Sequence, residues 1–193
     1  GGILNRTTIW DDGELFAKDE GPGMCLIDKW IRTNSKKKYD ANGDIAKNGK
    51  VNKIILNKYF DKFEIPNPER KSYDTNDFDI SFVKGLSLED GAATLTYYTA
   101  NLLNTFFLAN KKLKIKEKII LCGGGRKNKF LVGIIKNHNN EIKLIDDYGI
   151  DGDFVESQAF AYLAIRSYLK LPISFPNTTG VKKPCAGGII IKY

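Results

Sequence analysis

The sequence is poor in the residues from which many catalytic sites are built. Among 193 residues there is one histidine, His138, and there are three cysteines, Cys25, Cys122 and Cys185. A single histidine excludes a metal site built from several histidines. Three widely spaced cysteines argue against a disulfide framework or a zinc site. Reduced thiols are typical of the cytosol, so we expect a cytoplasmic protein.

Long apolar runs are also missing. No stretch approaches the roughly 20 apolar residues that a membrane-spanning helix needs, and no charged and then apolar leader opens the chain. We therefore expect no membrane partner. The chain opens at Gly1 and its only methionine is Met24, which is not the pattern of a plain translation start. We expect a piece of a longer protein.

The net charge of +7 first suggests phosphate ligands or nucleic acid. The lysines, however, are scattered among asparagine and isoleucine, and only residues 35–38 and 111–118 are densely basic. A solvated surface explains both stretches. Because no basic segment is interleaved with aromatic residues, as a nucleic-acid platform would require, we expect no nucleic-acid partner. Hydrophobic residues make up 42% of the chain, enough to bury a core.

Hydrophobic spacing predicts a hairpin and then strands that alternate with helices. The hairpin is expected over residues 3–9 and 15–17, with Asp12 and Gly13 in its turn and a tight loop over residues 19–23. Helices are predicted over residues 24–32, 51–63, 129–137 and 153–170 and from Ser87 onward, and strands over residues 119–122, 142–145 and 187–192. This order predicts an α/β fold with a mixed sheet and helices on both of its faces.

Residues 121–128 read "LCGGGRKN", so three consecutive glycines lie between a predicted strand and a predicted helix. Glycine costs about 0.5–1 kcal/mol relative to alanine inside a helix or strand, so the run needs a reason. Two interpretations fit. The loop can bring its backbone against a flat or anionic ligand at the carboxyl end of a strand, or it can allow close packing of strand against helix. Cys122, which lacks a basic partner, is expected to be a buried strand residue.

Eight stretches in order carry a resemblance to a known family. They are "GGILN" (residues 1–5), "DEGPG" followed by "LID" (19–28), "YDANGDIAKNGKV" (39–51), "RKSYDTNDF" (70–78), "LEDGAATLTYYTA" (88–100), "CGGGRKN" (122–128), "ESQAFAYLA" (156–164) and "FPNTTG" (175–180). Over nearly its whole length the chain resembles the C-terminal half of anhydro-N-acetylmuramic acid kinases, which are actin-like sugar kinases.

The resemblance implies one lobe, residues 1–193, of an actin-like, ribonuclease H-like kinase, without the N-terminal lobe. Such kinases use ATP and Mg²⁺ to phosphorylate 1,6-anhydro-N-acetylmuramic acid while water opens the anhydro bridge, a step of peptidoglycan recycling. The expected partners are therefore ATP, the anhydro amino sugar and the missing lobe, and the family's tendency to dimerise makes a homodimer an expectation. The general base belongs to the missing lobe, so no catalytic residue is assigned in this chain.

The resemblance also implies where ligands would lie. The residues expected at the nucleotide all belong to the glycine-rich motifs. Gly123, Gly124 and Gly125 would lie against the adenosine, with Asn128 nearby, and Gly1, Gly2 and Asn5 would face the β- and γ-phosphates. Asp19, Gly21 and Gly23 would form the phosphate side of the cleft. Asp19 either faces magnesium through water or only fixes its glycine turn, and both interpretations stay open.

Glu156 is the expected sugar ligand by resemblance. On the residues alone, Asp153 and Glu156 also fit a capping box at the start of the predicted helix, and both roles can hold together. Glu156 is further predicted to lie at the edge of a packed face that carries Leu163 and Tyr168.

Several positions depart from the family's pattern. Met24 stands where the family has asparagine, Arg126 where it has a small residue, and Lys18 and Glu20 flank Asp19. Glu20 adds negative charge near the expected phosphates, which should weaken binding. Three interpretations follow: an enzyme half that needs its first lobe, a lone lobe that binds nucleotide without chemistry, or a remnant that keeps only the fold. We expect the chain by itself to be inactive.

Overall fold

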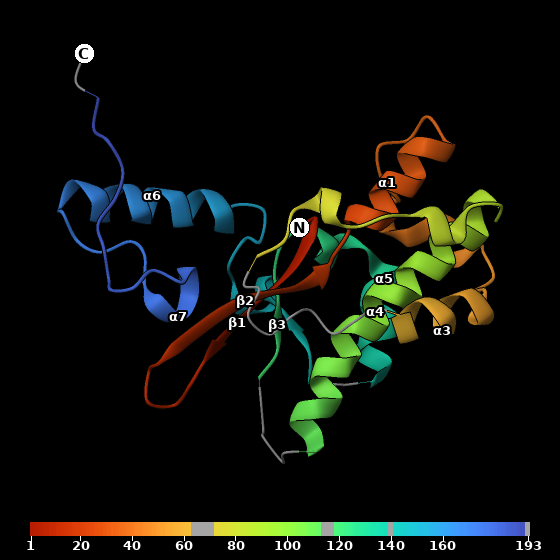
Figure 1. Cartoon of the computed structure of the whole chain (residues 1–193), viewed down its shortest axis with the longest axis horizontal. Helices are drawn as coiled ribbons and strands as arrows, with labels where there is room; N and C mark the ends of the chain where they lie inside the picture. Colours follow the sequence, from red (N-terminus) through yellow and green to blue (C-terminus); the bar gives the residue numbers. More distant parts are fainter. Residues whose placement is uncertain (63–71, 113–117, 139–140, 192–193) are drawn as a thin grey trace.

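A computed structural model describes residues 1–62, 72–112, 118–138 and 141–191 (Figure 1). The strands are β1 (Ile3–Ile9), β2 (Leu15–Pro22), β3 (Ile120–Leu121) and β4 (Lys143–Leu144). The α-helices are α1 (Cys25–Asn34), α2 (Asp44–Lys47), α3 (Lys53–Lys62), α4 (Leu88–Lys112), α5 (Lys129–His138), α6 (Val155–Tyr168) and α7 (Pro176–Thr179). Short 3-10 helices are η1 (Ala41–Gly43), η2 (Thr75–Asp77), η3 (Ser81–Val83), η4 (Gly124–Lys127) and η5 (Ile145–Tyr148). The predicted α/β class is confirmed.

The predicted N-terminal hairpin is confirmed, and it is longer than expected. Gly13, with φ +86°, allows the turn, where its N–H donates to the Trp10 carbonyl at 2.9 Å. β2 continues through residues 19–22, so the tight loop expected there is wrong. A bulge after Leu4 pairs Leu4 with Gly21 and Asn5 with Asp19, which leaves Glu20 as the extra residue. The bulge lets the strand continue across a stretch whose glycine and proline suggested a turn.

The strands form two separate pairs rather than one mixed sheet, so this part of the prediction is wrong for the described residues. β1 and β2 are antiparallel, whereas β3 and β4 are parallel and only two residues long each. Helices supply most of the interior instead. Figure 1 places α1, α3, α4 and α5 on one side of the hairpin and α6 with α7 on the other.

Helix α4 organises the larger core. The Ser87 hydroxyl accepts a hydrogen bond from Asp90 N at 3.1 Å, which confirms Ser87 as the predicted start. Leu95 and Tyr98 of α4 are fully buried against α1, whose Trp30 donates from Nε1 to the Leu88 carbonyl at 2.9 Å. The prediction of α1 over residues 24–32 and of α3 over 51–63 is confirmed within two residues at each end that the structure describes.

A second core holds the glycine loop in place. Leu131, Ile134 and Ile135 of α5 pack with Ala100 of α4 and with Ile142, which directly precedes β4. This cluster fixes α5 beside β3 and β4, so the loop that joins β3 to α5 has a rigid support on both sides. The predicted helix over residues 129–137 is confirmed.

The C-terminal region differs most from expectation. The predicted helix over residues 153–170 exists as α6, but it buries none of its residues, and Phe160 and Tyr168 are 65% and 72% exposed. The packed face expected around Leu163 is therefore absent in the described structure. Residues 187–191 form no strand, which makes the prediction for that stretch wrong, and Ile189 is 92% exposed. None of the helices in the described parts of the chain combines the length and apolar character needed to cross a bilayer.

Two glycines in helices provide a test of the packing. A Cβ at Gly91 of α4 would overlap the Trp30 indole, whereas a Cβ at Gly133 of α5 would meet nothing within 4 Å. We predict that Gly91→Ala lowers the free energy of unfolding by about 1–3 kcal/mol through overpacking. Gly133→Ala should raise it by up to about 1 kcal/mol through helix propensity alone. Urea unfolding of both variants measures the two signs, and a stabilising Gly91→Ala would contradict the described α1–α4 packing.

Candidate functional site

The candidate site lies where the two parallel strands end. Ile120 pairs with Lys143 and Leu121 with Leu144, so β3 and β4 point the same way and their carboxyl ends share one edge. The chain leaves β3 into the glycine loop and leaves β4 into η5. This arrangement confirms that the glycine run follows the carboxyl end of a strand, the place where α/β proteins collect ligands. Cys122 is exposed there, so its predicted burial is wrong: β3 ends one residue earlier, at Leu121.

The three glycines have different surroundings. Gly123 adopts φ +79°, which favours glycine, and a Cβ there would lie 3.1 Å from the Gly1 nitrogen. A Cβ at Gly125 would lie 3.3 Å from Met24 Cγ. Gly124 is exposed, and a Cβ there would meet nothing within 4 Å. The packing interpretation therefore holds for the two outer glycines. The middle glycine is exposed, and its contact with a ligand stays a prediction.

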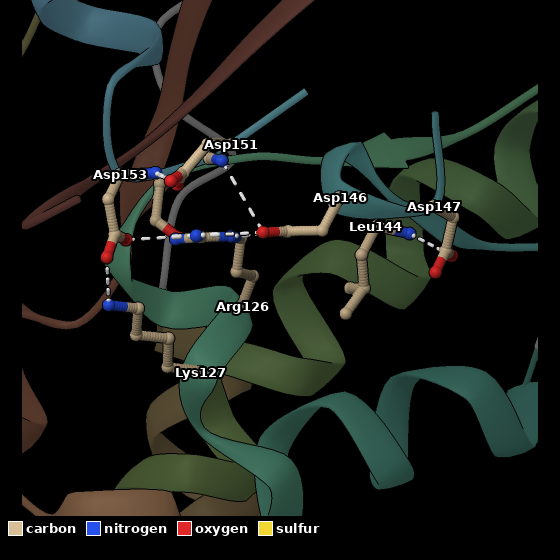
Figure 2. A network of polar contacts seen from close by, with 9 residues as sticks. Arg126, Lys127, Leu144, Asp146, Asp147, Asp151 and Asp153 are labelled. Carbon is tan, nitrogen blue, oxygen red and sulfur yellow. Dashed lines mark hydrogen bonds and ion pairs between the residues drawn. The ribbon is translucent and has the colours of Figure 1, made fainter. Parts of the chain in front are cut away.

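Arg126 ties this loop to its neighbours (Figure 2). Its guanidinium donates to Asp146 Oδ2 from Nε at 2.7 Å and to Asp146 Oδ1 from Nη2 at 3.1 Å. Nη2 also donates to Asp153 Oδ1 at 2.9 Å, and Nη1 donates to the Gly123 carbonyl at 3.2 Å. The Arg126 side chain is only 5% exposed. Gly152 lies flat against the guanidinium, which a Cβ at that position would overlap.

The charges in this cluster shift one another's proton equilibria. The hydrogen bonds from Arg126 lower the pKa of Asp146 to about 2. Lys127 first and Arg126 second lower the pKa of Asp153, since both cations donate to its carboxylate. The same carboxylates raise the pKa of Arg126, Asp146 most of all. Each of these three shifts favours the charged form of Arg126, Asp146 or Asp153, so the hydrogen bonds among them persist at neutral pH.

The N-terminal glycines meet the start of α1. The Gly1 carbonyl accepts from Met24 N at 3.0 Å, and the Gly2 carbonyl accepts from Gly23 N at 2.9 Å and from Cys25 N at 3.1 Å. A Cβ at Gly23 would lie 2.8 Å from the Gly1 oxygen, so no other residue fits there without movement. Gly21 and Gly23 are both buried. These glycines permit close backbone contact and place Gly1 beside the glycine loop.

Two polar pairs follow on the hairpin. Asn5 Nδ2 donates to Asp19 Oδ1 at 2.7 Å, and Asp19 Oδ2 accepts from Tyr73 N at 2.8 Å. Glu20 is 3% exposed, and its Oε1 accepts from Arg6 Nε and Nη2, each at 2.8 Å. Arg6 therefore offsets the negative charge that the sequence places next to the expected phosphates.

Asp19 is the candidate for a metal contact. Each of its oxygens accepts one of the hydrogen bonds above, and an ionised carboxylate has about four acceptor positions, so capacity remains for water on a hydrated cation. Within the residues that the structure describes, no group of three or more His, Cys, Asp or Glu could hold a metal directly. The donor set thus fits an outer-sphere magnesium contact better than direct coordination.

Asn128 and Glu156 lie differently from what the sequence predicts. Asn128 is 3% exposed, and its Oδ1 accepts from Leu131 N at 2.9 Å, so it caps α5 from inside the protein. Phe154, not Asp153, is the N-cap of α6, and no side chain caps this helix; the predicted capping box is wrong because Asp153 binds Arg126 and Lys127 instead. Glu156 is exposed, and its side chain makes no hydrogen bond with the described residues.

A groove of about 390 Å³ opens beside α5. Its walls come from η1, α2, α4 and α5, and its lining includes Asn42, Lys47, Tyr97 and Phe130. Phe130 follows the cap residue Asn128 by two positions, and its ring meets that of Tyr97 edge to face at 6.2 Å. The groove therefore pairs aromatic walls with polar side chains, a combination that suits a flat organic ligand.

Comparison with known proteins agrees with this arrangement. A family model described as anhydro-N-acetylmuramic acid kinase matches residues 1–193. The chain belongs to that family. Relatives named anhydro-N-acetylmuramic acid kinase are 50% identical over 200 residues in Pelagibacter ubique, 39% over 197 in Zymomonas mobilis and 38% over 192 in Caulobacter vibrioides. The matches cover 98–100% of this chain but only 51–53% of each relative, so the chain spans about half of their length.

The structure of this family member brings together most of the residues expected at a nucleotide. Gly1, Gly2 and Gly23 meet at the start of α1, Gly123 lies against Gly1, and Asn5 bonds Asp19. Asn128 adjoins the loop but faces the protein, and Glu156 stands apart on α6.

Sequence reasoning missed the partners of Arg126. It marked Arg126 only as a departure from the family's pattern. The signal that could have found them is the run "DDYGIDGD" at residues 146–153, where acids and glycines alternate just after a strand.

The lowered pKa of Asp146 gives a prediction about acid stability. Its folded value of about 2 lies below the ordinary value of about 3.9, so the ion pair stabilises the fold above about pH 4 and is lost as pH falls toward 2. Asp146→Asn should therefore lower the urea midpoint at pH 7, and the difference from the native chain should shrink between pH 4 and pH 2. The control is Asp11→Asn in the exposed hairpin turn. A pH-independent difference, or an equal effect of the control, would contradict the ion-pair assignment.

Proposed function

We propose that this chain is the C-terminal, nucleotide-side lobe of a kinase that uses ATP and Mg²⁺ to phosphorylate 1,6-anhydro-N-acetylmuramic acid as water opens the anhydro bridge. Family membership over the whole chain supports the kinase assignment, and the half-length match supports a lobe rather than a whole enzyme. The observation that carries the proposal is the approach of Gly1 to Gly123, because two glycine segments far apart in sequence meet where a phosphate chain could pass.

The proposed role of the loop is to hold the nucleotide by its backbone. Gly124 presents an exposed backbone without a side chain, while Gly123 and Gly125 anchor the turn from inside. The aromatic groove begins at Lys129 and Phe130, directly after the loop, and offers a place for the adenine ring. Arg126 does not contact phosphate in this proposal, since Asp146, Asp153 and Gly123 already occupy its donors; it fixes the shape of the loop.

The hairpin end is proposed to face the phosphates. Asn5 orients the Asp19 carboxylate, and Tyr73 N holds its second oxygen, so the carboxylate can bind water on a hydrated magnesium ion. Bound Mg²⁺ supplies charge stabilisation to the transferring phosphoryl group. This chain contributes positioning only, since we assign the base that activates water to the other half of the enzyme. Glu156 is proposed to reach the sugar once that half is present.

The first test of this proposal is activity with and without a second half. We predict no ATP-dependent phosphorylation of the anhydro sugar by this chain alone. A chimera that joins the half of the Pelagibacter ubique relative that this chain does not match to residues 1–193 should phosphorylate it. The measurement is transfer of labelled γ-phosphate to the sugar. Turnover by the chain alone would refute the lobe assignment, and a folded but silent chimera would favour a lobe that binds nucleotide without chemistry or a remnant.

A second test addresses the glycine loop. In the chimera, Gly124→Leu should raise the KM for ATP about tenfold or more, because the added side chain enters the space proposed for the nucleotide, while folding stability changes by about 0.5 kcal/mol or less. Lys58→Leu is the control, since Lys58 is exposed on α3 and does not line the groove proposed for the adenine ring. Equal KM values for both variants would place the nucleotide elsewhere.

A further inference from the structure

Helix α6 carries apolar side chains around most of its circumference and buries none of them. Phe160, Tyr162, Ile165 and Tyr168 are between 58% and 72% exposed, and Leu169 just beyond the helix is 57% exposed. At about 100° per residue, Phe160, Tyr168, Ile165 and Tyr162 lie at roughly 0°, 80°, 140° and 200° around the helix, so they spread over more than half of its circumference. Helices that are apolar on several sides are normally buried. This helix therefore has the composition of an interior element and the exposure of a surface one.

The C-terminal tail, residues 187–191, also combines apolar side chains with high exposure to solvent. Ile189, Ile190 and Ile191 are 92%, 55% and 71% exposed, and β-branched residues of this kind favour strands. Residues 187–191 make no backbone hydrogen bond with the described parts of the chain, although Cys185 just before them pairs with Ser174 as an antiparallel bridge. The tail is thus a segment outside any helix or strand, and its backbone groups have no ladder partner in the described structure.

Contacts within the chain hold both α6 and the tail in position. Asp153 fixes the entry to α6 through Arg126, and Arg166 Nε donates to the Pro172 carbonyl at 2.7 Å at its exit. Helix α7 packs against β2, and Asn177 Nδ2 donates to Glu14 across that contact at 3.4 Å. Figure 1 shows the tail running beside α6, on the side of the hairpin opposite the main helical core. The exposed surface is therefore presented in a fixed orientation.

We propose that α6 and residues 187–191, here called the α6–tail surface, dock against the other half of the kinase, with the tail pairing as a strand on an edge of that half. This inference rests on the proposed function, because it takes the occupant to be the portion that relatives carry beyond this chain. Those relatives are about twice as long, so each of them carries a further half that could cover the corresponding surface.

The chemistry of the surface favours this occupant. Side chains exposed on several sides of one helix need cover from more than one direction, which a folded domain provides and a short peptide does not. Free N–H and C=O groups along an extended tail are satisfied by strand addition, which supplies register as well as affinity. The Asp153–Arg126 contact then connects the docked helix directly to the glycine loop.

Hydrogen exchange tests the pairing of the tail. We expect the amides of residues 188–191 to exchange at least tenfold more slowly in the chimera described above than in this chain alone, without ATP or sugar present. Ile189→Asp should abolish that protection, and Ile165→Asp should weaken it. Ile54→Asp is the matched control, because Ile54 lies on α3 and is 82% exposed. It should leave the protection unchanged.

Each outcome decides the inference separately from the kinase assignment. Tail protection that is sensitive to Ile189→Asp and insensitive to Ile54→Asp supports docking, even in a chimera that fails to phosphorylate. A chimera that phosphorylates while its tail amides exchange as fast as in the chain alone overturns docking and leaves the kinase assignment intact. Protection of the tail in concentrated samples of the chain alone, lost on dilution, would assign the surface to a second copy and also overturn the proposal.

Discussion

The candidate site depends on one buried guanidinium. Arg126 holds the glycine loop through the Gly123 carbonyl, η5 through Asp146 and the entry to α6 through Asp153. β3 and β4 are only two residues long and could not align these segments by their own ladder. A planar side chain with five donors can bind three partners at fixed angles, which lysine could not do. The loop conformation, the direction of α6 and the open face at Gly124 therefore follow from this single residue.

Close backbone packing is the second constraint. The backbone of residues 1–4 lies so close to Gly23 that a Cβ on Gly23 would touch it. The Gly1 nitrogen is similarly close to Gly123, so a Cβ on Gly123 would contact that nitrogen. Glycines of this kind let two backbone segments approach more closely than any residue with a side chain would allow. The Arg6–Glu20 ion pair, in which Glu20 is buried and Arg6 is partly exposed, lies on the same hairpin and offsets the negative charge of Glu20.

Local patterns predicted the elements and several site residues but not their environment. Capping and periodicity located α4, α5 and the hairpin, because each of these depends on neighbours within a few residues. The cap predicted at Asp153 was wrong because its partner Arg126 lies far away in the sequence, and the cap that Asn128 provides through Leu131 N was not predicted. The bulge at Glu20 was not predicted for a similar reason. Residues 20–22 ("EGP") continue a strand only because β1 pairs with them, and the local sequence gives no signal of that pairing. The resemblance located the glycine motifs, yet Arg126 stands where the family usually has a small residue.

The predictions for α6 and the tail failed for a different reason, and that reason bears on how the chain is completed. The sequence predicted a packed helix face and a strand there, because apolar residues at those spacings normally lie in a core. The described chain lacks that core, and Phe160 and Ile189 remain in solvent. We propose that local sequence and local structure conflict here because a partner outside the described chain covers these segments, and the half-length match to the family supports this proposal. Asp153 joins the start of α6 to Arg126, and Arg126 holds the glycine loop. A domain that covers α6 would therefore also affect the position of the glycine loop, so completing the fold and completing the site require the same domain.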